Sequence, residues 1–95
     1  MPAQYLEFYG SKTRLHANDV ICYNKRTWKI RILRKNIPIA FSYGKKANGD
    51  YLAAFYLDDK KAFGSFCNFV AWSFGLNIES QTKEVEGEYR AKLLD

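Results

Sequence analysis

The chain has 95 residues, a formal net charge of +5, one histidine and two cysteines. Its length fits one domain, residues 1–95, and its seven Tyr, seven Phe and two Trp can build an efficient core, which excludes global disorder. Cys22 and Cys67 lie far apart, and with a single histidine they fall short of the roughly four ligands of a structural zinc site. We therefore expect no metal and no cofactor.

The N-terminal segment MPAQYLEFYG has neither the basic region nor the apolar region of a secretory signal peptide. No apolar run approaches the roughly 20 residues that a membrane-spanning helix needs. These features predict a cytoplasmic protein with no membrane partner, in which both cysteines are buried free thiols.

Three short segments open the chain. Residues 4–9 are aromatic and weakly alternating, which predicts a strand that ends at Gly10 and Ser11. Residues 12–18 fit either a loop or an irregular strand. Residues 19–23, DVICY, are apolar and rich in β-branched side chains, and this pattern predicts a strand entering a turn.

The stretch NKRTWKIRILRKN, residues 24–36, carries six of the fifteen basic residues. Trp28, Ile30 and Ile32 alternate with basic side chains, so the stretch predicts a strand with a core face and a basic face, interrupted only by Leu33. Residues 34–36 predict a turn, and residues 37–43 a return strand in which Pro38 marks the start or an exposed edge. Asn48-Gly49 then predicts a hairpin leading to a third strand at residues 51–57.

Residues 59–74 predict a helix with Asp58 or Asp59 as its N-cap and Gly75 just past its end. Leu76 can close the C-terminal cap. Trp72 lies off the apolar arc, near the polar side. That arc comprises Ala62, Phe63, Phe66, Phe69, Val70 and Phe74, with Cys67 at its edge.

The tail, residues 82–94, fits both a period of two and a helical period, and Gly87 favours the strand because it costs a helix about 1 kcal/mol relative to Ala. Residues 76–80 can pair with it. The predicted fold class is α+β: an antiparallel β-meander of three to five strands packed against one amphipathic helix.

Charge is concentrated in one segment. Residues 25–46 carry a formal charge of +8 without a single acid, whereas residues 79–95 carry −2. A basic band along a sheet is typical of phosphate binding, and Tyr43 and Tyr56 are candidates for stacking on bases. We therefore predict a nucleic-acid-binding protein, for DNA or RNA, with little sequence specificity. The predicted phosphate contacts are Lys25, Arg26, Lys29, Arg31, Arg34, Lys35, Lys45 and Lys46.

Two other interpretations stay open. A basic solvent face also discourages edge-to-edge aggregation of sheets and needs no ligand. Alternatively, Trp72 beside an aromatic-rich helix is typical of an interface anchor. It predicts a protein-interaction or inhibitor module that covers an acidic protein surface, or a homodimer formed through helices.

Catalysis has little support. His16 has no nucleophile or orienting acid in a recognisable arrangement near it, and Cys67 lies on an apolar helix face. A helix cap accounts for Asp58 and Asp59, and the solvent face of a strand accounts for Glu84, Glu86 and Glu88. The glycines form no phosphate-cradling loop. The sequence predicts binding without enzymatic chemistry.

Overall fold

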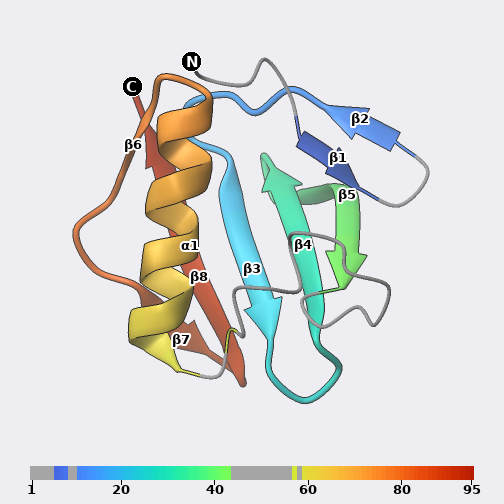
Figure 1. Ribbon diagram of the computed structural model, residues 1–95. Helices are drawn as coiled ribbons and strands as arrows, with labels where there is room; N and C mark the ends of the chain where they lie inside the picture. Colours follow the sequence, from blue (N-terminus) through green and yellow to red (C-terminus); the bar gives the residue numbers. More distant parts are fainter. Residues whose placement is uncertain (1–5, 9–10, 44–56, 58) are drawn as a thin grey trace.

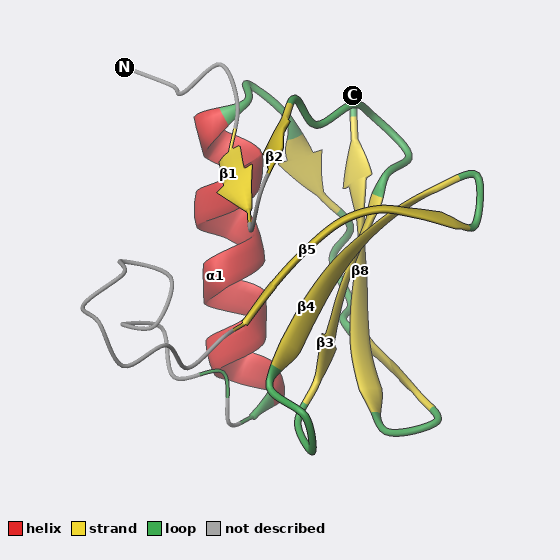
Figure 2. Ribbon diagram, turned by 90° about the vertical axis from the view of Figure 1, so that its right-hand side faces the viewer, coloured by secondary structure: helices red, strands yellow, loops and turns green. Residues whose placement is uncertain are grey.

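An antiparallel sheet packs against a single helix in the computed structural model, which describes residues 6–8, 11–43, 57 and 59–95 (Figures 1 and 2). The strand order is β5-β4-β3-β8-β6, and β7 also pairs with β8; a separate hairpin joins β1 to β2. The predicted α+β class is confirmed. The elements are β1 (Leu6–Phe8), β2 (Ser11–Thr13), β3 (Val20–Asn24), β4 (Lys29–Arg34), β5 (Ile37–Tyr43), α1 (Lys60–Ser73), β6 (Asn77–Ile78), β7 (Lys83–Val85) and β8 (Glu88–Leu94).

Strands β3, β4 and β5 form the antiparallel meander that the alternation predicts. Ile21 faces Ile32, which in turn faces Ala40, so one face of all three strands is apolar and belongs to the core cluster that also contains the buried side chains of α1. The predicted hairpin at Asn48-Gly49 and the predicted strand at residues 51–57 lie outside the described residues, apart from Leu57, which is buried.

The β3–β4 turn includes Trp28, which the alternation assigned to the strand. The expected burial of the Trp28 side chain is wrong. Trp28 has a φ of 62°, its N–H donates to the Asn24 carbonyl at 2.8 Å, and its side chain is exposed. The side chain of Asn24 accepts from the N–H groups of Arg26 and Thr27. This hydrogen-bonded turn holds Trp28 in a left-handed conformation that a strand residue cannot adopt, so the strand begins at Lys29.

Helix α1 begins and ends as predicted. The Asp59 carboxylate accepts from the N–H of Ala62 at 2.8 Å, and the N–H of Leu76 donates to the Ala71 carbonyl past Gly75, whose φ is 69°. Phe69, however, is exposed rather than part of the core. In projection down the helix axis, the buried side chains form an arc with Ser73 at one edge, Val70 and Phe63 in the middle and Ala71 at the other edge. At 100° per residue, Phe69 falls just beyond the edge at Ser73.

The tail is a strand and a central one. Glu86 and Gly87, with φ of 52° and 81°, form a two-residue turn of the kind that suits a hairpin between β7 and β8. Residues 88–92 of β8 pair with the whole of β3, and β6 and β7 pair with opposite ends of the other edge of β8, which confirms the predicted pairing near residues 76–80. The last strand therefore contributes as much to the sheet as the basic stretch does.

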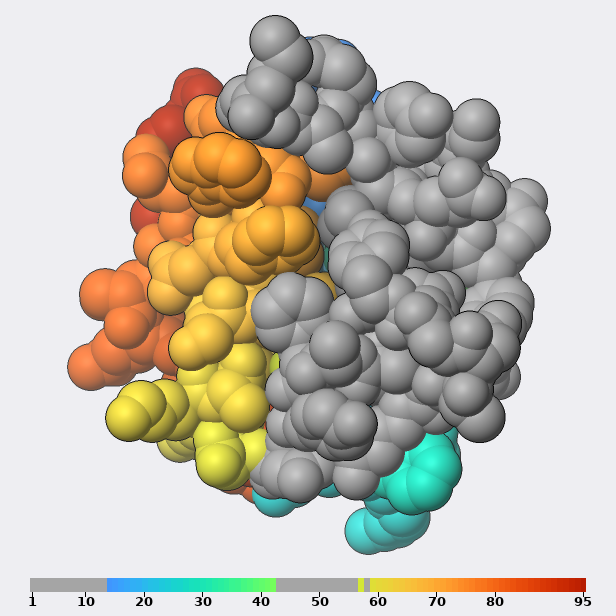
Figure 3. All heavy atoms as spheres, viewed as in Figure 1, coloured from blue at the N-terminus to red at the C-terminus, as the bar shows by residue number. Residues whose placement is uncertain are grey.

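Figure 3 views the molecule from the side that α1 covers, where its side chains, yellow to orange, form part of the surface. Figure 2 shows α1 against one face of the sheet only. Among the described residues, no helix is long or apolar enough to cross a membrane.

Candidate anion-binding face

The face of the sheet turned away from α1, here called the outer face, carries most of the charge of its strands. Alternation along β3, β4 and β8 buries one set of side chains in the core that the sheet shares with α1 and turns the other set outward. Its charged members are Lys29, Arg31, Lys83, Glu88, Arg90 and Lys92, a formal net charge of +4.

Strand pairing places cations from three strands in one row. Cys22 on β3 has Arg31 as its register partner on one side and Arg90 on the other. Arg31 in turn pairs with Phe41, and Arg90 pairs with Lys83. The row across the sheet therefore reads Phe41, Arg31, Cys22, Arg90 and Lys83.

Two arginines share one carboxylate on this face. Nη2 of Arg31 lies 2.8 Å from Oε1 of Glu88, and Nε of Arg31 lies 3.2 Å from Oε2. Nη2 of Arg90 lies 2.9 Å from the same Oε1. Cys22 lies between the two arginines, and its short side chain leaves their guanidinium groups room to converge. We call Arg31, Glu88 and Arg90 the arginine pair and its carboxylate.

The electrostatics follow from this geometry. Burial opposes ionisation of Glu88, but hydrogen bonds from Arg31 and then Arg90 outweigh it and lower the pKa of the carboxyl below its ordinary value of 4.5. The hydrogen bond to Glu88 raises the pKa of Arg90. Burial, and next the charge of Glu88, raises the pKa of the Cys22 thiol to about 11, so Cys22 is a protonated packing residue at neutral pH and not a nucleophile.

Positive charge on the outer face exceeds what its one carboxylate neutralises. Within the described residues, Lys29, Lys83 and Lys92 have no carboxylate within ion-pair distance. Nε of Arg90 is buried and has no hydrogen-bond acceptor there. An exposed aromatic ring adjoins these charges, because Nζ of Lys29 lies 4.9 Å from the centroid of Phe41. The face thus combines uncompensated cations with an accessible ring.

The structure separates the predicted phosphate contacts into groups. Lys29 and Arg31 lie on the outer face, whereas Arg34 lies on the opposite side of β4. Arg34 donates through Nε and Nη2 to both carboxylate oxygens of Asp19, at 3.0 and 2.9 Å, and Asp19 is only 1% exposed. The hydrogen bond with Asp19 also raises the pKa of Arg34. Arg34 therefore neutralises a buried carboxylate and belongs to the framework.

The remaining predicted cations lie at the two ends of β4. Lys25 and Arg26 are exposed in the β3–β4 turn, and Lys35 is exposed in the β4–β5 turn. Tyr43 ends β5 as the register partner of Lys29. The side chain of Tyr43, and Lys45, Lys46 and Tyr56 altogether, lie outside the described residues.

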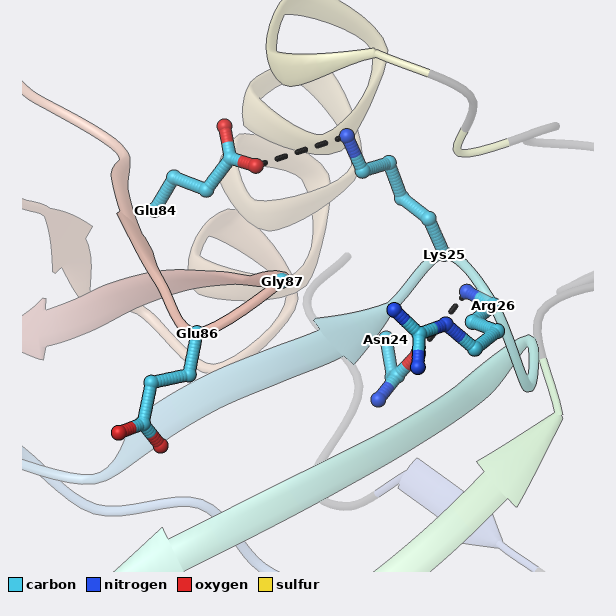
Figure 4. A pocket seen from close by; sticks show the side chains of 6 residues that line it. All are labelled: Asn24, Lys25, Arg26, Glu84, Glu86 and Gly87. Atoms are coloured by element: carbon cyan, nitrogen blue, oxygen red, sulfur yellow. Dashed lines mark hydrogen bonds and ion pairs between the residues drawn. The ribbon is translucent and has the colours of Figure 1, made fainter.

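A cleft of about 380 Å³ separates the β3–β4 turn from the β7–β8 turn. Figure 4 shows Lys25 reaching across it toward Glu84, with 3.6 Å between Nζ and the nearer oxygen, while the carboxylate of Glu86 points away. Its two basic residues, Lys25 and Arg26, are balanced by these two acidic ones. The cleft carries no net charge and does not extend the basic outer face.

Sequence reasoning missed Lys83, Arg90 and Lys92, because they belong to a segment whose net charge is −2. The signal was present in the alternation of residues 88–93, which puts Arg90 and Lys92 on one side of a strand. Only the pairing of β8 with β3 adds them to the face that carries Arg31.

A second surface feature lies on α1. Trp72 is 55% exposed, as its place off the apolar arc predicted, and its ring centroid lies 6.2 Å from that of Phe69, which is also exposed. The two cysteines are free and buried, as predicted. In the described part of the chain, no three His, Cys, Asp or Glu residues are grouped so that they could hold a metal ion.

Comparison with protein-family models, with curated proteins and with solved structures found no match to this chain.

Proposed function

We propose that this protein binds single-stranded nucleic acid, DNA or RNA, across the outer face of its sheet, with little sequence specificity and without enzymatic chemistry. The observation that carries the proposal is the arginine pair and its carboxylate: two guanidinium groups share one carboxylate on a sheet face that also carries three unneutralised lysines. Sequence-independent binding to nucleic acid is driven by such cations, which displace counterions from the phosphates.

Single strands suit this surface better than a duplex does. In the described part of the chain, this face is a sheet from which no helix or ribbon projects, and reading a duplex in the major groove requires such an element. A sheet with an exposed ring offers a platform on which a base can stack, and stacking contributes about 1–3 kcal/mol per base. Phe41, which adjoins Lys29 and Arg31, is the ring in that position.

Salt dependence tests the proposal. For single strands, the logarithm of the association constant falls by about 0.7 per phosphate contact for each tenfold rise in salt. With up to five cations on the outer face, we expect a slope of about −2 to −3.5 for a thymidine oligonucleotide of about 15 nucleotides, measured by fluorescence anisotropy. Absence of binding at about 50 mM salt, or preference for a duplex, contradicts the proposal.

A matched pair of variants locates the binding surface. Lys29→Gln with Lys92→Gln removes two charges from the outer face, and we expect the slope to become shallower by about 1.4. Lys60→Gln with Lys61→Gln removes the same charge from exposed positions on α1, and we expect the slope to stay unchanged. Equal effects of the two double variants would mean that binding follows net charge alone and is not a property of the outer face.

The exposed ring pair on α1 favours a second candidate function, a protein-interaction or inhibitor module. Phe69 and Trp72 are flanked toward the start of the helix by exposed Lys60 and Lys61, so the complementary partner is an acidic protein surface with an apolar centre. A purified partner should lose binding to Trp72→Ala and keep binding to the Lys29→Gln, Lys92→Gln variant. A dimer in sedimentation that Trp72→Ala abolishes would instead identify a second copy of the chain.

A further inference from the structure

We propose that Arg31 and Arg90 form a seat for one phosphate group, and that Glu88 is a positioning residue that holds the two guanidinium groups in place for it. This inference rests on the proposed function, because the phosphate is a phosphodiester of the bound strand. It assigns the arginine pair a specific role beyond its share of the general positive charge.

The depth order of the three side chains supports the assignment. The side chain of Glu88 is 10% exposed, whereas those of Arg31 and Arg90 are 28% and 31% exposed. The carboxylate is therefore the deepest of the three groups and the guanidinium groups lie nearer to solvent. An anion that approaches the outer face meets guanidinium N–H groups before it meets the carboxylate.

Arg31 and Arg90 have N–H donors that Glu88 does not use. Each guanidinium group carries five N–H donors. Arg31 uses Nε and Nη2 and Arg90 uses only Nη2, all toward Glu88. Within the described residues, Nη1 of Arg90 has no acceptor within hydrogen-bond distance. Nε of Arg90 also lacks an acceptor, but it is buried, so the donors that an approaching anion can reach at this arginine are those of Nη1 and Nη2. Guanidinium groups bind phosphate through two parallel N–H donors, and both arginines retain donors for this purpose.

Two guanidinium charges against one carboxylate point to a second anion. Arg31 alone already makes a two-pronged pair with Glu88, which needs no further cation. Arg90 brings a like charge close to Arg31, and that repulsion costs free energy unless another negative group is shared with it. A phosphate between the two guanidinium groups supplies that negative group. The row arrangement across β4, β3 and β8 fixes both arginines from rigid strands rather than from loops.

Replacement of Glu88 separates positioning from simple attraction. Glu88→Gln adds one unit of positive charge to the outer face, so a face that works by net charge alone would bind the oligonucleotide more tightly. If Glu88 positions the arginines, the same variant binds more weakly, because a neutral carboxamide makes weaker hydrogen bonds to guanidinium groups and presents an NH2 donor where one carboxylate oxygen accepts from Arg31. We expect about tenfold weaker binding, the lower end of the loss that follows removal of a group that orients a metal ligand.

Glu84→Gln is the matched control. It makes the same chemical change and adds the same charge, but Glu84 contacts Lys25 at the turn cleft rather than the arginine pair. We expect binding of the thymidine oligonucleotide by Glu84→Gln to equal or slightly exceed that of the unchanged protein. Tighter or unchanged binding by Glu88→Gln would overturn the seat while leaving the proposed function intact.

A direct readout uses the Nε–H resonances of the arginines in an NMR titration with inorganic phosphate. We expect shifts at Arg31 and Arg90, and none at Arg14, an exposed arginine whose carbonyl accepts from Arg34. Should Glu88→Gln fail to fold, Arg90→Lys keeps the charge and removes the planar fork, and it should bind the oligonucleotide about tenfold more weakly while Arg14→Lys binds normally. Shifts confined to Arg14, or normal binding by Arg90→Lys, would overturn the seat. Absence of oligonucleotide binding altogether would instead remove the proposed function.

Discussion

Arg31 and Arg34 lie three residues apart on β4 and serve opposite purposes. Arg34 faces one carboxylate, Asp19, which is almost completely buried and accepts from both Nε and Nη2 of the arginine. Arg31 shares Glu88 with a second arginine, near the surface. One cation per carboxylate makes a closed framework contact, whereas two cations per carboxylate leave charge available to a ligand. The difference shows that a basic stretch divides into structural and binding residues according to what its partners neutralise.

Removal of the Asp19 carboxylate tests its contact with Arg34 and should have the largest effect on the free energy of unfolding. Asp19→Ala removes the buried carboxylate that accepts from Nε and Nη2 of Arg34 and from the N–H of His16, and only Nη2 keeps another acceptor, the Arg14 carbonyl. We expect a loss of about 2–3 kcal/mol in the free energy of unfolding, measured with urea. Glu86→Ala, at an exposed turn residue, serves as the control and should change stability by less than about 0.5 kcal/mol. Equal effects of the two variants would contradict the distinction between framework and surface carboxylates.

Removal of the Glu88 charge should cost less, about 1–2 kcal/mol near neutral pH, because its partners are partly solvated. The pKa of Glu88 is lowered in the folded state, so its stabilisation is complete above the ordinary value of 4.5 and is lost as the pH falls through the folded-state pKa. The stability difference between the unchanged protein and Glu88→Gln should therefore shrink on acidification. Urea unfolding near pH 7 and near pH 3 measures it, and a difference that grows with acid would refute the pairing.

The ion pair between Lys25 and Glu84 should contribute the least stability of the carboxylate contacts compared. It spans the turn cleft at 3.6 Å between two exposed side chains. A double-mutant cycle with Lys25→Ala and Glu84→Ala should give a coupling energy below about 0.5 kcal/mol, since solvent screens exposed ion pairs. A coupling of about 1 kcal/mol or more would show that the cleft is a rigid part of the structure.

The fold was largely predictable because it depends on local patterns. The alternation in residues 27–33 predicted β4, the apolar arc of residues 59–74 predicted α1, and Gly87 favoured the strand that became β8. The errors are also local in origin. Trp28 lies outside the strand because the Asn24 side chain accepts hydrogen bonds from the N–H groups of the turn and lengthens it. Phe69 lies outside the core because the buried arc of α1 is centred on Phe63 and Val70.

Some residues of the candidate site could be predicted from the sequence and others could not. Lys29 and Arg31 were named from the sequence, and they do lie on one outward face. The structural role of Arg34 could not be predicted from the sequence, because the carboxylate that neutralises it is fifteen residues away in the chain. Arg90 was hidden in an acidic segment, and its relation to Arg31 exists only through β3, which separates them in the sheet.

The sequence by itself determined the class of the fold, the strands of the meander, the ends of the helix and the basic sign of one strand face, because each depends on the periodicity and turn chemistry of neighbouring residues. Only the tertiary structure decided which cations are neutralised. That outcome depends on strand pairing between β3 and β8, and on the depth at which Asp19 and Glu88 are buried. Coulombic interactions act between residues that are close in space, and the order of residues along the chain does not specify that closeness.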